Sequence, residues 1–355
     1  MMPIRYADVQ RILIRSANWV GDAIMTTPAV HTVRRTFPRA HITLLAKPWV
    51  FPVFENNPDI DELMIYETDG RHAGWVGLWG LAKDLKRRRF DLAILLQNAF
   101  EAALLAFWAR IPKRLGFTTD ARTVLLTERI RSWRLLQQGH LIDYYLGLLS
   151  GAGLTLHGRQ LVLVINDKEG AAARRLLQSM GIDGNQLLIG FNPGATYGNA
   201  KRWLPERFAE LGRRLSREFE ARVLIFGSAV EAQLGRQIAA EIGLGAVNFC
   251  GQTPLRQAMS LIGQCDLFIT NDSGLMHVAA ALNVPQAAII GPTDPVATGP
   301  SNRVSRLVQV PGACSLSPCL RPECPILDHR CMTAVSVEMV MAEVISLLEQ
   351  PQERS

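Results

Sequence analysis

The sequence predicts an α/β protein built from two doubly wound parallel-sheet domains. Short apolar runs rich in Val, Ile and Leu alternate with stretches of helical period along the chain, a pattern typical of parallel strands covered by helices on both faces. The length of 355 residues suits two domains of about 150 to 200 residues better than one core. No short repeat of fixed period is present, which argues against a solenoid.

The expected strands fall into two groups. The first half should contain strands at 11–15, 41–46, 63–66 and 91–97, and the second half at 187–192, 222–226, 246–249, 266–270 and 286–290. Helices should lie between them, for example over 205–219 and 255–263. We place the first domain at 1–165 and the second at 166–355. Ligands of such sheets bind beyond the carboxyl ends of strands where the strand order reverses, so the two domains should face a cleft.

Composition and charge narrow the function classes. The first residues lack the apolar stretch of a signal peptide, and Asn283 and Pro285 interrupt the strongest apolar run, well short of the roughly 20 residues of a membrane span. We therefore expect a cytoplasmic protein. Residues 1–165 hold 21 Lys and Arg against 14 Asp and Glu, whereas the remainder is nearly balanced at 17 against 18. This excess fits nucleic acid, an anionic membrane surface, a phosphorylated substrate or simply a solvated basic face.

The first candidate loop is SANWVGD at 16–22, which follows the first strand and leads into a helix expected to continue through Val33. It has one glycine instead of the G-x-G-x-x-G spacing of a dinucleotide-binding turn, which removes the main argument for an oxidoreductase. Two interpretations of Asp22 stay open. It either complements the positive end of the helix or acts as a general base.

The second candidate loop is NPGATYGNAKRW at 192–203, between a strand and a helix opened by Pro205. A glycine-containing loop of this kind can surround phosphate with backbone N–H groups, and Lys201 would add positive charge. The alternative is an irregular surface loop, which is less attractive because long ordered loops between strand and helix usually serve a function.

The third candidate loop begins NDSGLMH at 271–277, after another strand. Asp272 or Ser273 should cap a helix whose first N–H groups form an anion site. Gly274 permits close approach of a phosphate to the backbone. We expect His277 to be a packed core histidine rather than a catalyst.

Five strings in this order resemble the ADP-heptose:lipopolysaccharide heptosyltransferases of glycosyltransferase family 9, above all the heptosyltransferase II branch. They are WVGD at 19–22, GFNPGATYGNAKRW at 190–203, FGSA at 226–229, NDSGLMHVAAALN at 271–283 and GPTDP at 291–295. The resemblance implies the GT-B architecture of two Rossmann-like domains. It makes 1–165 the acceptor-binding domain and 166–355, with its cysteine-containing tail and terminal helix, the ADP-heptose-binding domain.

The resemblance also implies an inverting transfer of heptose from ADP-L-glycero-D-manno-heptose to the heptosyl-Kdo2-lipid A inner core of lipopolysaccharide. Heptosyltransferases I or III, which use other core acceptors, and a non-catalytic nucleotide-sugar-binding protein are the alternatives. The implied partners are the ADP-heptose donor and a lipid A core acceptor at the inner face of the inner membrane, with peripheral association and a monomeric enzyme. Nucleic acid is not expected, because the basic segments lack interleaved aromatic motifs.

Site residues are carried over position by position from this resemblance. Asp22 resembles the catalytic base, and Lys201 would stabilise the leaving diphosphate. The expected substrate contacts are Thr196 and Lys201 for the pyrophosphate, Glu231 for the ribose, Thr253 for the adenine through its backbone, and Asp272, Ser273, Gly274 and Leu275 for the heptose and phosphates. No Asp-x-Asp pair stands at a suitable strand end, so we expect transfer without a metal or other cofactor.

Two features remain open at this level. Cys314, Cys319, Cys324 and Cys331, with His329 nearby, are compatible with a structural metal, with reduced thiols or with disulfides. Cys250 and Cys265, by contrast, should be buried and reduced. The possible contacts of a phosphorylated acceptor are Arg15, Arg71, Arg87, Arg88, Arg89, Lys113, Arg114 and Arg122.

Overall fold

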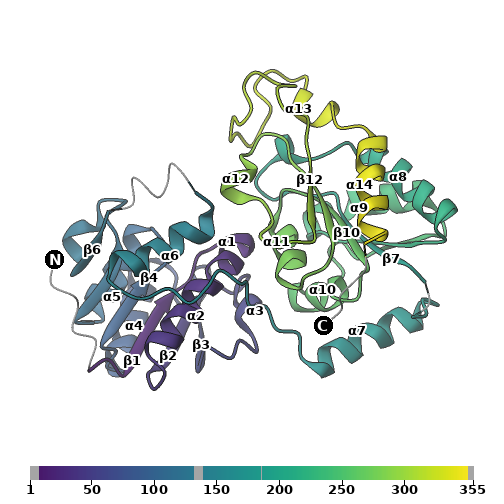
Figure 1. The fold of residues 1–355 in the computed structure, drawn as a ribbon. Helices are drawn as coiled ribbons and strands as arrows, with labels where there is room; N and C mark the ends of the chain where they lie inside the picture. The colour runs from purple at the N-terminus through teal and green to yellow at the C-terminus, as the bar shows by residue number, and fades with distance from the viewer. Residues whose placement is uncertain (1–7, 132–138, 185, 351–355) are drawn as a thin grey trace. The chain divides into compact units, whose positions relative to one another are not determined.

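The computed structural model describes residues 8–131, 139–184 and 186–350, and the chain divides into two compact units, Met1–Val164 and Ile165–Ser355 (Figure 1). Residues 1–7, which belong to the segment predicted to lack a signal peptide, lie outside the described residues. Among the described helices, none combines the length and the apolar character that crossing a bilayer requires.

The first unit contains a parallel sheet of order β3-β2-β1-β4-β5-β6. Its strands are β1 (Arg11–Arg15), β2 (His41–Ala46), β3 (Glu62–Ile65), β4 (Leu92–Leu95), β5 (Lys113–Phe117) and β6 (Glu128–Ile130). Its helices are α1 (Val20–Met25), α2 (Thr27–Thr36), α3 (Phe51–Phe54), α4 (Gly74–Arg87), α5 (Phe100–Trp108) and α6 (Leu141–Gly151), with a 3-10 turn η1 (Arg122–Leu125). The helices α4 and α5 pack over the apolar face that carries Leu13, Ala93 and Leu95.

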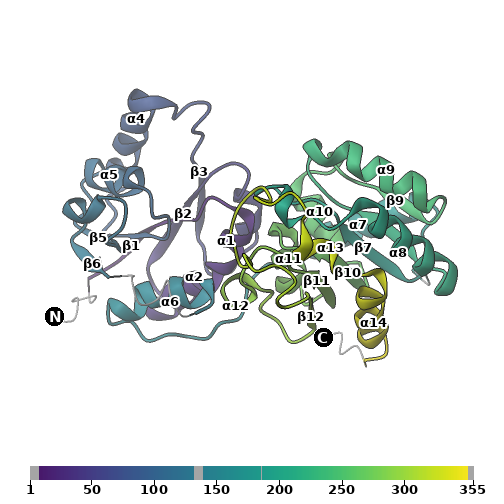
Figure 2. The same cartoon turned by 90° about the horizontal axis from the view of Figure 1, so that it is seen from above.

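The second unit repeats this plan with the order β12-β11-β10-β7-β8-β9. Its strands are β7 (Leu188–Asn192), β8 (Arg222–Ile225), β9 (Ala246–Asn248), β10 (Leu267–Asn271), β11 (Gln286–Ile289) and β12 (Ser305–Val308). Its helices are α7 (Asp167–Ser179), α8 (Pro205–Glu218), α9 (Ala232–Ile242), α10 (Leu255–Ile262), α11 (Gly274–Ala281), α12 (Pro295–Thr298), α13 (Arg330–Thr333) and α14 (Val337–Leu348), with 3-10 turns η2 (Asn199–Lys201) and η3 (Ala229–Glu231). The terminal helix α14 packs onto the sheet beside α8 and completes the core (Figure 2).

The two doubly wound parallel sheets of the prediction are confirmed, and nine expected strands occur with ends shifted by no more than a few residues. Three strands, β5, β6 and β12, were not predicted. Each is short or begins with charged or polar residues, as in KRLGF, ERI and SRLV. β6 and β12 are also sheet edges, where burial imposes a weaker apolar pattern.

The helix expected to run from residue 20 through Val33 was wrong, because Thr26 separates α1 from α2. Pro28 has no N–H to donate to the preceding turn. The hydroxyl of Thr27 instead donates to the carbonyl oxygen of Ile24 at 2.7 Å, and that of Thr26 donates to Ala23 at 2.6 Å. The threonine side chains thus satisfy carbonyl groups that a continuous helix would have used.

Candidate functional site

The candidate loops lie where the strand order reverses. In the first sheet the reversal falls between β1 and β4, and in the second between β7 and β10. The loop that leads to Asp22 follows β1, the loop that carries Lys201 follows β7, and the turn at Asp272 follows β10. Each loop therefore lies at the carboxyl ends of the strands of its own sheet, where ligands of doubly wound folds bind.

Lys201 and Asp272 form an ion pair across the reversal point of the second sheet. Lys201 Nζ donates to Asp272 Oδ2 at 2.7 Å, and both side chains are largely shielded, with 15% and 5% of their surface exposed. Thr293 Oγ1 donates to the same carboxylate oxygen at 2.7 Å. Tyr197 places its ring 5.1 Å from the ammonium group. Two loops predicted separately from the sequence are therefore joined through opposite charges.

Two asparagines at the strand ends hold this arrangement, and sequence reasoning did not single them out. Asn271 Oδ1 accepts from Trp203 N at 3.0 Å, and its Nδ2 donates to Pro193 O at 2.8 Å. Asn192 Nδ2 donates to Phe226 O at 3.1 Å, and its Oδ1 accepts from Ser273 Oγ. Because a carboxamide both donates and accepts, each asparagine ties neighbouring loops together. Their position as the last residues of β7 and β10 was the available signal.

The capping prediction for α11 was wrong in detail. Ser273 occupies the residue before the helix, but its side chain makes no capping hydrogen bond to the helix backbone, because its hydroxyl donates to Asn192 instead. Asp272 does not cap either, since its carboxylate binds Lys201 and Thr293. The positive end of α11, where Gly274 and Leu275 form the first turn, is thus left without a side-chain cap.

Glu231 is buried against the loop at 192–203, which we call the Lys201 loop. Its Oε2 accepts from Ser228 N at 2.7 Å and Ser228 Oγ at 2.9 Å, which fixes η3. Its Oε1 faces Arg202 at 3.8 Å. A Cβ at Gly194 would lie 1.8 Å from that oxygen, so the glycine is what lets the carboxylate approach the loop.

The other expected donor contacts differ in exposure. Thr196 is exposed in the loop after β7, and Gly274 and Leu275 are half-buried at the start of α11. Thr253 is half-buried in the turn between β9 and α10, away in sequence from the β7 and β10 loops. His277 is buried in α11, as expected for a packed histidine.

Asp22 is half-buried in the first turn of α1. α1 packs against α6, which carries Tyr145. Burial raises the pKa of the Tyr145 hydroxyl, and the negative charge of Asp22 raises it further. A carboxylate in the first helical turn is favoured by the helix dipole, so this location is compatible with both the structural and the catalytic interpretation.

Two of the suggested acceptor contacts are instead internal supports. Arg15 donates to Ser16 O at 2.8 Å and to Asn18 Oδ1 at 2.9 Å, which shapes the loop before Asp22. Burial lowers the pKa of Arg15 to about 10, an effect that Glu101 and Tyr66 oppose. Arg122 donates to Asn98 Oδ1 at 2.8 Å, and Asn98 donates to the Tyr144 hydroxyl at 2.6 Å. Both arginines are buried, so among the eight possible acceptor contacts these two instead hold the protein's own loops.

The remaining cations differ in availability. Arg88 binds the Glu62 carboxylate at 2.6 Å, and Arg71 and Arg87 both reach Asp84 at the surface. Arg89 is exposed, whereas Lys113 and Arg114 are half-buried. The sequence count of basic residues therefore overstates the free positive charge of the first unit.

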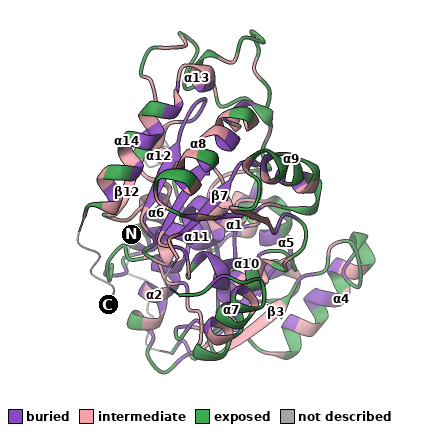
Figure 3. Ribbon diagram, turned by 90° about the vertical axis from the view of Figure 1, so that its right-hand side faces the viewer, coloured by how far each residue is buried: buried purple, intermediate pink, exposed green. Residues whose placement is uncertain are grey.

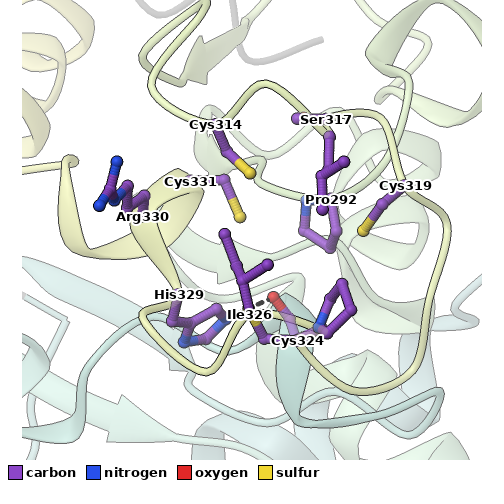
Figure 4. Close-up of a pocket in the computed structure, with 12 residues that line it drawn as sticks. Pro292, Cys314, Ser317, Cys319, Cys324, Ile326, His329, Arg330 and Cys331 are labelled. Atoms are coloured by element: carbon purple, nitrogen blue, oxygen red, sulfur yellow. Dashed lines mark hydrogen bonds between the residues drawn. The ribbon is translucent and has the colours of Figure 1, made fainter.

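The four C-terminal cysteines line one small cavity of about 10 Å³ in the second unit (Figure 4). All are free thiols, and the figure shows them around Ile326 and Pro292. Burial, with the neighbouring thiols, raises the pKa of Cys331 to about 11. Among the described residues, no three His, Cys, Asp or Glu side chains are grouped so as to hold a metal ion.

Residues 314–331, which carry these four cysteines and which we call the cysteine-bearing segment, pack against the Lys201 loop. His329 Nε2 donates to Ala200 O at 2.7 Å, and Ala200 N donates to Pro322 O at 3.0 Å. Tyr197 donates its hydroxyl to Leu320 O at 3.0 Å. Cys250 and Cys265 lie elsewhere, and their predicted burial is confirmed. Burial raises the pKa of Cys250 to about 12 and that of Cys265 further.

Comparison with known proteins identifies the family. The sequence model of glycosyltransferase family 9 (heptosyltransferase) matches residues 78–328. The chain belongs to this family. Lipopolysaccharide heptosyltransferase 2 of Escherichia coli K12 is 33% identical over 314 residues, which cover 84% of this chain and 88% of that protein. Lipopolysaccharide heptosyltransferase 3 of the same organism is 24% identical over 285 residues, with coverage of 78% and 81%.

Solved structures of the family share the fold. The structure of E. coli ADP-heptose lipopolysaccharide heptosyltransferase II aligns with a TM-score of 0.80 at 29% identity and covers 96% of this chain and 98% of its own. The two six-stranded parallel sheets with flanking helices are accordingly the two Rossmann-like units of the GT-B architecture. The family 9 assignment makes this protein a glycosyltransferase.

Proposed function

We propose that this glycosyltransferase is a heptosyltransferase II. It transfers heptose from ADP-L-glycero-D-manno-heptose to the heptosyl-Kdo2-lipid A inner core of lipopolysaccharide, with inversion at the anomeric carbon. The higher identity to a type 2 than to a type 3 enzyme of one organism supports this acceptor. The structural observation that carries the proposal is the Lys201–Asp272 pair beside the uncapped start of α11.

The second unit would bind the donor. A diphosphate entering beside α11 would meet the positive helix end and draw Lys201 away from Asp272. Asp272 would then be released to accept hydrogen bonds from sugar hydroxyl groups, while Ser273, Gly274 and Leu275 present backbone N–H groups to phosphate. Thr196 would contribute a hydroxyl to the same phosphates. Glu231 would bind the ribose through Oε1, since Oε2 is already occupied by Ser228, and Thr253 would lie at the adenine.

The first unit would bind the acceptor and supply the base. Asp22 would remove the proton from the acceptor hydroxyl as that oxygen attacks the anomeric carbon. The bond to the ADP oxygen breaks on the opposite face, which inverts the centre, and Lys201 with the start of α11 would stabilise the charge that develops on the departing diphosphate.

The acceptor's chemistry sets the cellular context of the proposal. A lipid-linked acceptor resides in a bilayer, so we propose a cytoplasmic monomer that associates peripherally with the inner face of the inner membrane and binds no nucleic acid. The test is transfer from ADP-heptose to lipid A cores that carry zero, one or two heptoses. Transfer only to the core with one heptose supports heptosyltransferase II, while preference for another core would reassign the acceptor.

The catalytic role of Asp22 is tested by Asp22→Asn. The variant should keep ADP-heptose binding but lose at least about a hundredfold in turnover, as is typical when a general base is removed. Asp69→Asn, which changes an exposed carboxylate of the same unit, is the matched control and should keep full turnover. Single-turnover rates and donor calorimetry decide the matter, and unchanged turnover in Asp22→Asn would leave Asp22 with only a structural role at α1.

A further inference from the structure

The first unit exposes a group of large apolar side chains on two neighbouring helices. On α4, Trp75, Val76 and Trp79 are 70%, 85% and 52% exposed, and on α5 Phe107 is 47% exposed. Contiguous exposed apolar side chains usually mark an interaction site, whereas scattered single ones do not. We call these four residues and the cations around them the α4–α5 surface.

The helical period explains why these side chains point outward together. α4 buries Leu78, Leu81, Ala82 and Leu85 against the sheet, and the alternation of buried and exposed residues along it is visible in Figure 3. Trp75 and Trp79 are one turn apart and so share the opposite face. The ring of Trp75 lies edge-on to Trp108 of α5, with ring centroids 6.2 Å apart, so the exposed aromatic rings belong to packed helices.

A basic groove of about 640 Å³ adjoins these rings at the junction of α4 and α5. Four cations line it, Lys83, Lys86, Arg110 and Arg114, and none of its described lining residues is acidic. Lys83 Nζ lies 3.5 Å from the centre of the Trp79 ring, and the Arg114 guanidinium lies 5.5 Å from the Phe107 ring. Positive charge and aromatic surface therefore alternate within one patch.

We propose that the α4–α5 surface docks the enzyme onto an anionic lipid bilayer. Trp75, Val76, Trp79 and Phe107 would enter the headgroup region, where tryptophan and apolar side chains are favoured, while the groove cations bind lipid phosphates. Val76 decides between lipid and nucleic acid, because an almost fully exposed valine gains from hydrocarbon but cannot stack on a base. The inference rests on the proposed function in one respect, since a lipid-linked acceptor requires work at a membrane.

The experiment measures vesicle binding by the full chain without donor or acceptor, so its result does not depend on heptosyl transfer. Sedimentation with phosphatidylglycerol-containing vesicles and with neutral phosphatidylcholine vesicles is compared for the wild type, for Trp75→Ser with Trp79→Ser, and for Lys83→Glu with Lys86→Glu. The matched control combines Leu244→Ser with Lys168→Glu, which changes an exposed leucine and an exposed lysine of the second unit. Circular dichroism establishes that all four proteins are folded.

The wild type and the control should bind anionic vesicles, with a blue shift of tryptophan emission, and should bind neutral vesicles at least tenfold more weakly. Each α4 variant should lose at least tenfold in anionic vesicle binding, and the tryptophan variant should lose the blue shift. Equal vesicle binding by variants and control overturns the proposal. So does a result in which the same variants lose only binding to a single-stranded oligonucleotide, or lose only self-association in sedimentation velocity, because the surface would then serve nucleic acid or a second copy of the chain.

Discussion

Lys201 has a charged partner within the second unit. Its ammonium group contacts Asp272 at 2.7 Å with little exposure to solvent, so in the proposed donor complex Lys201 would exchange one anionic partner for another. Such an exchange contributes little net affinity, because the ion pair with Asp272 breaks as the ion pair with the diphosphate forms. A lysine of this kind is suited to favour the state in which negative charge accumulates on the leaving oxygen.

We therefore expect Lys201→Ala to lower the catalytic rate more than it weakens ADP-heptose binding. The loss in rate should be about a hundredfold, which corresponds to roughly 3 kcal/mol for a contact to a developing oxyanion. Single-turnover rates measured beside donor calorimetry separate the two effects. Lys168→Ala, which removes an exposed lysine from α7, is the control. Equal losses in binding and rate, or no loss in either, would contradict this role.

Residue type and position predicted where the candidate loops lie better than they predicted which contacts each side chain makes. Arg15 and Arg122 were possible acceptor contacts on sequence alone, yet the structure buries both as supports of the β1 and β4 loops. Asn192 and Asn271 were part of the resembling strings, but their bonds to Phe226 and Pro193 depend on strand order. Strand order arises from contacts distant in sequence, which local periodicity does not contain.

At the scale of elements, the cysteine-bearing segment supports the Lys201 loop. Gly198 lies at their contact, where a Cβ would fall 2.1 Å from Pro322 O. Ala200 and Tyr197 bond to the same segment on either side of this point. The sequence linked neither the cysteines nor this glycine to the Lys201 loop, because the segments are more than one hundred residues apart.

Gly198→Ala should therefore separate the two segments and move Lys201. We expect a loss of about 1–3 kcal/mol in the free energy of unfolding, the usual cost of overpacking, together with weaker ADP-heptose binding. Urea unfolding of the full chain and donor calorimetry measure the two effects. The control is Gly184→Ala, since a Cβ at Gly184 meets nothing within 4 Å. If Gly198→Ala matches this control in both measurements, the segment does not support the loop.

The carboxyl ends of the second sheet carry a lysine and an uncapped helix start. Since Lys201 and the start of α11 both lie at the reversal point, charge on the diphosphate can be balanced by the protein itself. We expect heptosyl transfer to persist in excess chelator. Activity is compared before and after chelation. Circular dichroism checks that the protein stays folded in chelator, so that loss of a metal ion from the cysteine-bearing segment is not mistaken for loss of a catalytic metal. Complete loss of activity that magnesium or manganese restores would contradict this expectation.

For the whole molecule, the sequence predicted two doubly wound halves because buried parallel strands leave nearly continuous apolar runs. The shared order of the two sheets, with three strands on each side of the reversal point, could not be obtained in the same way. The edge strands β6 and β12 carry polar residues, so a prediction from apolar runs missed them and gave each sheet too few strands. The α4–α5 surface was also hidden, since its rings and cations come together only when the two helices pack.

Because the chain divides into two units, the proposal that the second unit binds the donor can be tested by locating bound nucleotide. If the second unit alone holds the donor nucleotide, ADP should protect backbone amides from hydrogen exchange at 193–203 and 272–276, and leave those at 16–22 unchanged. Binding to the native state at a hundred times the dissociation constant stabilises it by about 2.7 kcal/mol, which is ample for exchange measured by mass spectrometry on the full chain. AMP is the control ligand, because it lacks the second phosphate and should protect the Lys201 loop less than ADP does. Protection by ADP at 16–22 without protection at 193–203 would place the nucleotide in the first unit and reverse the assignment of donor and acceptor.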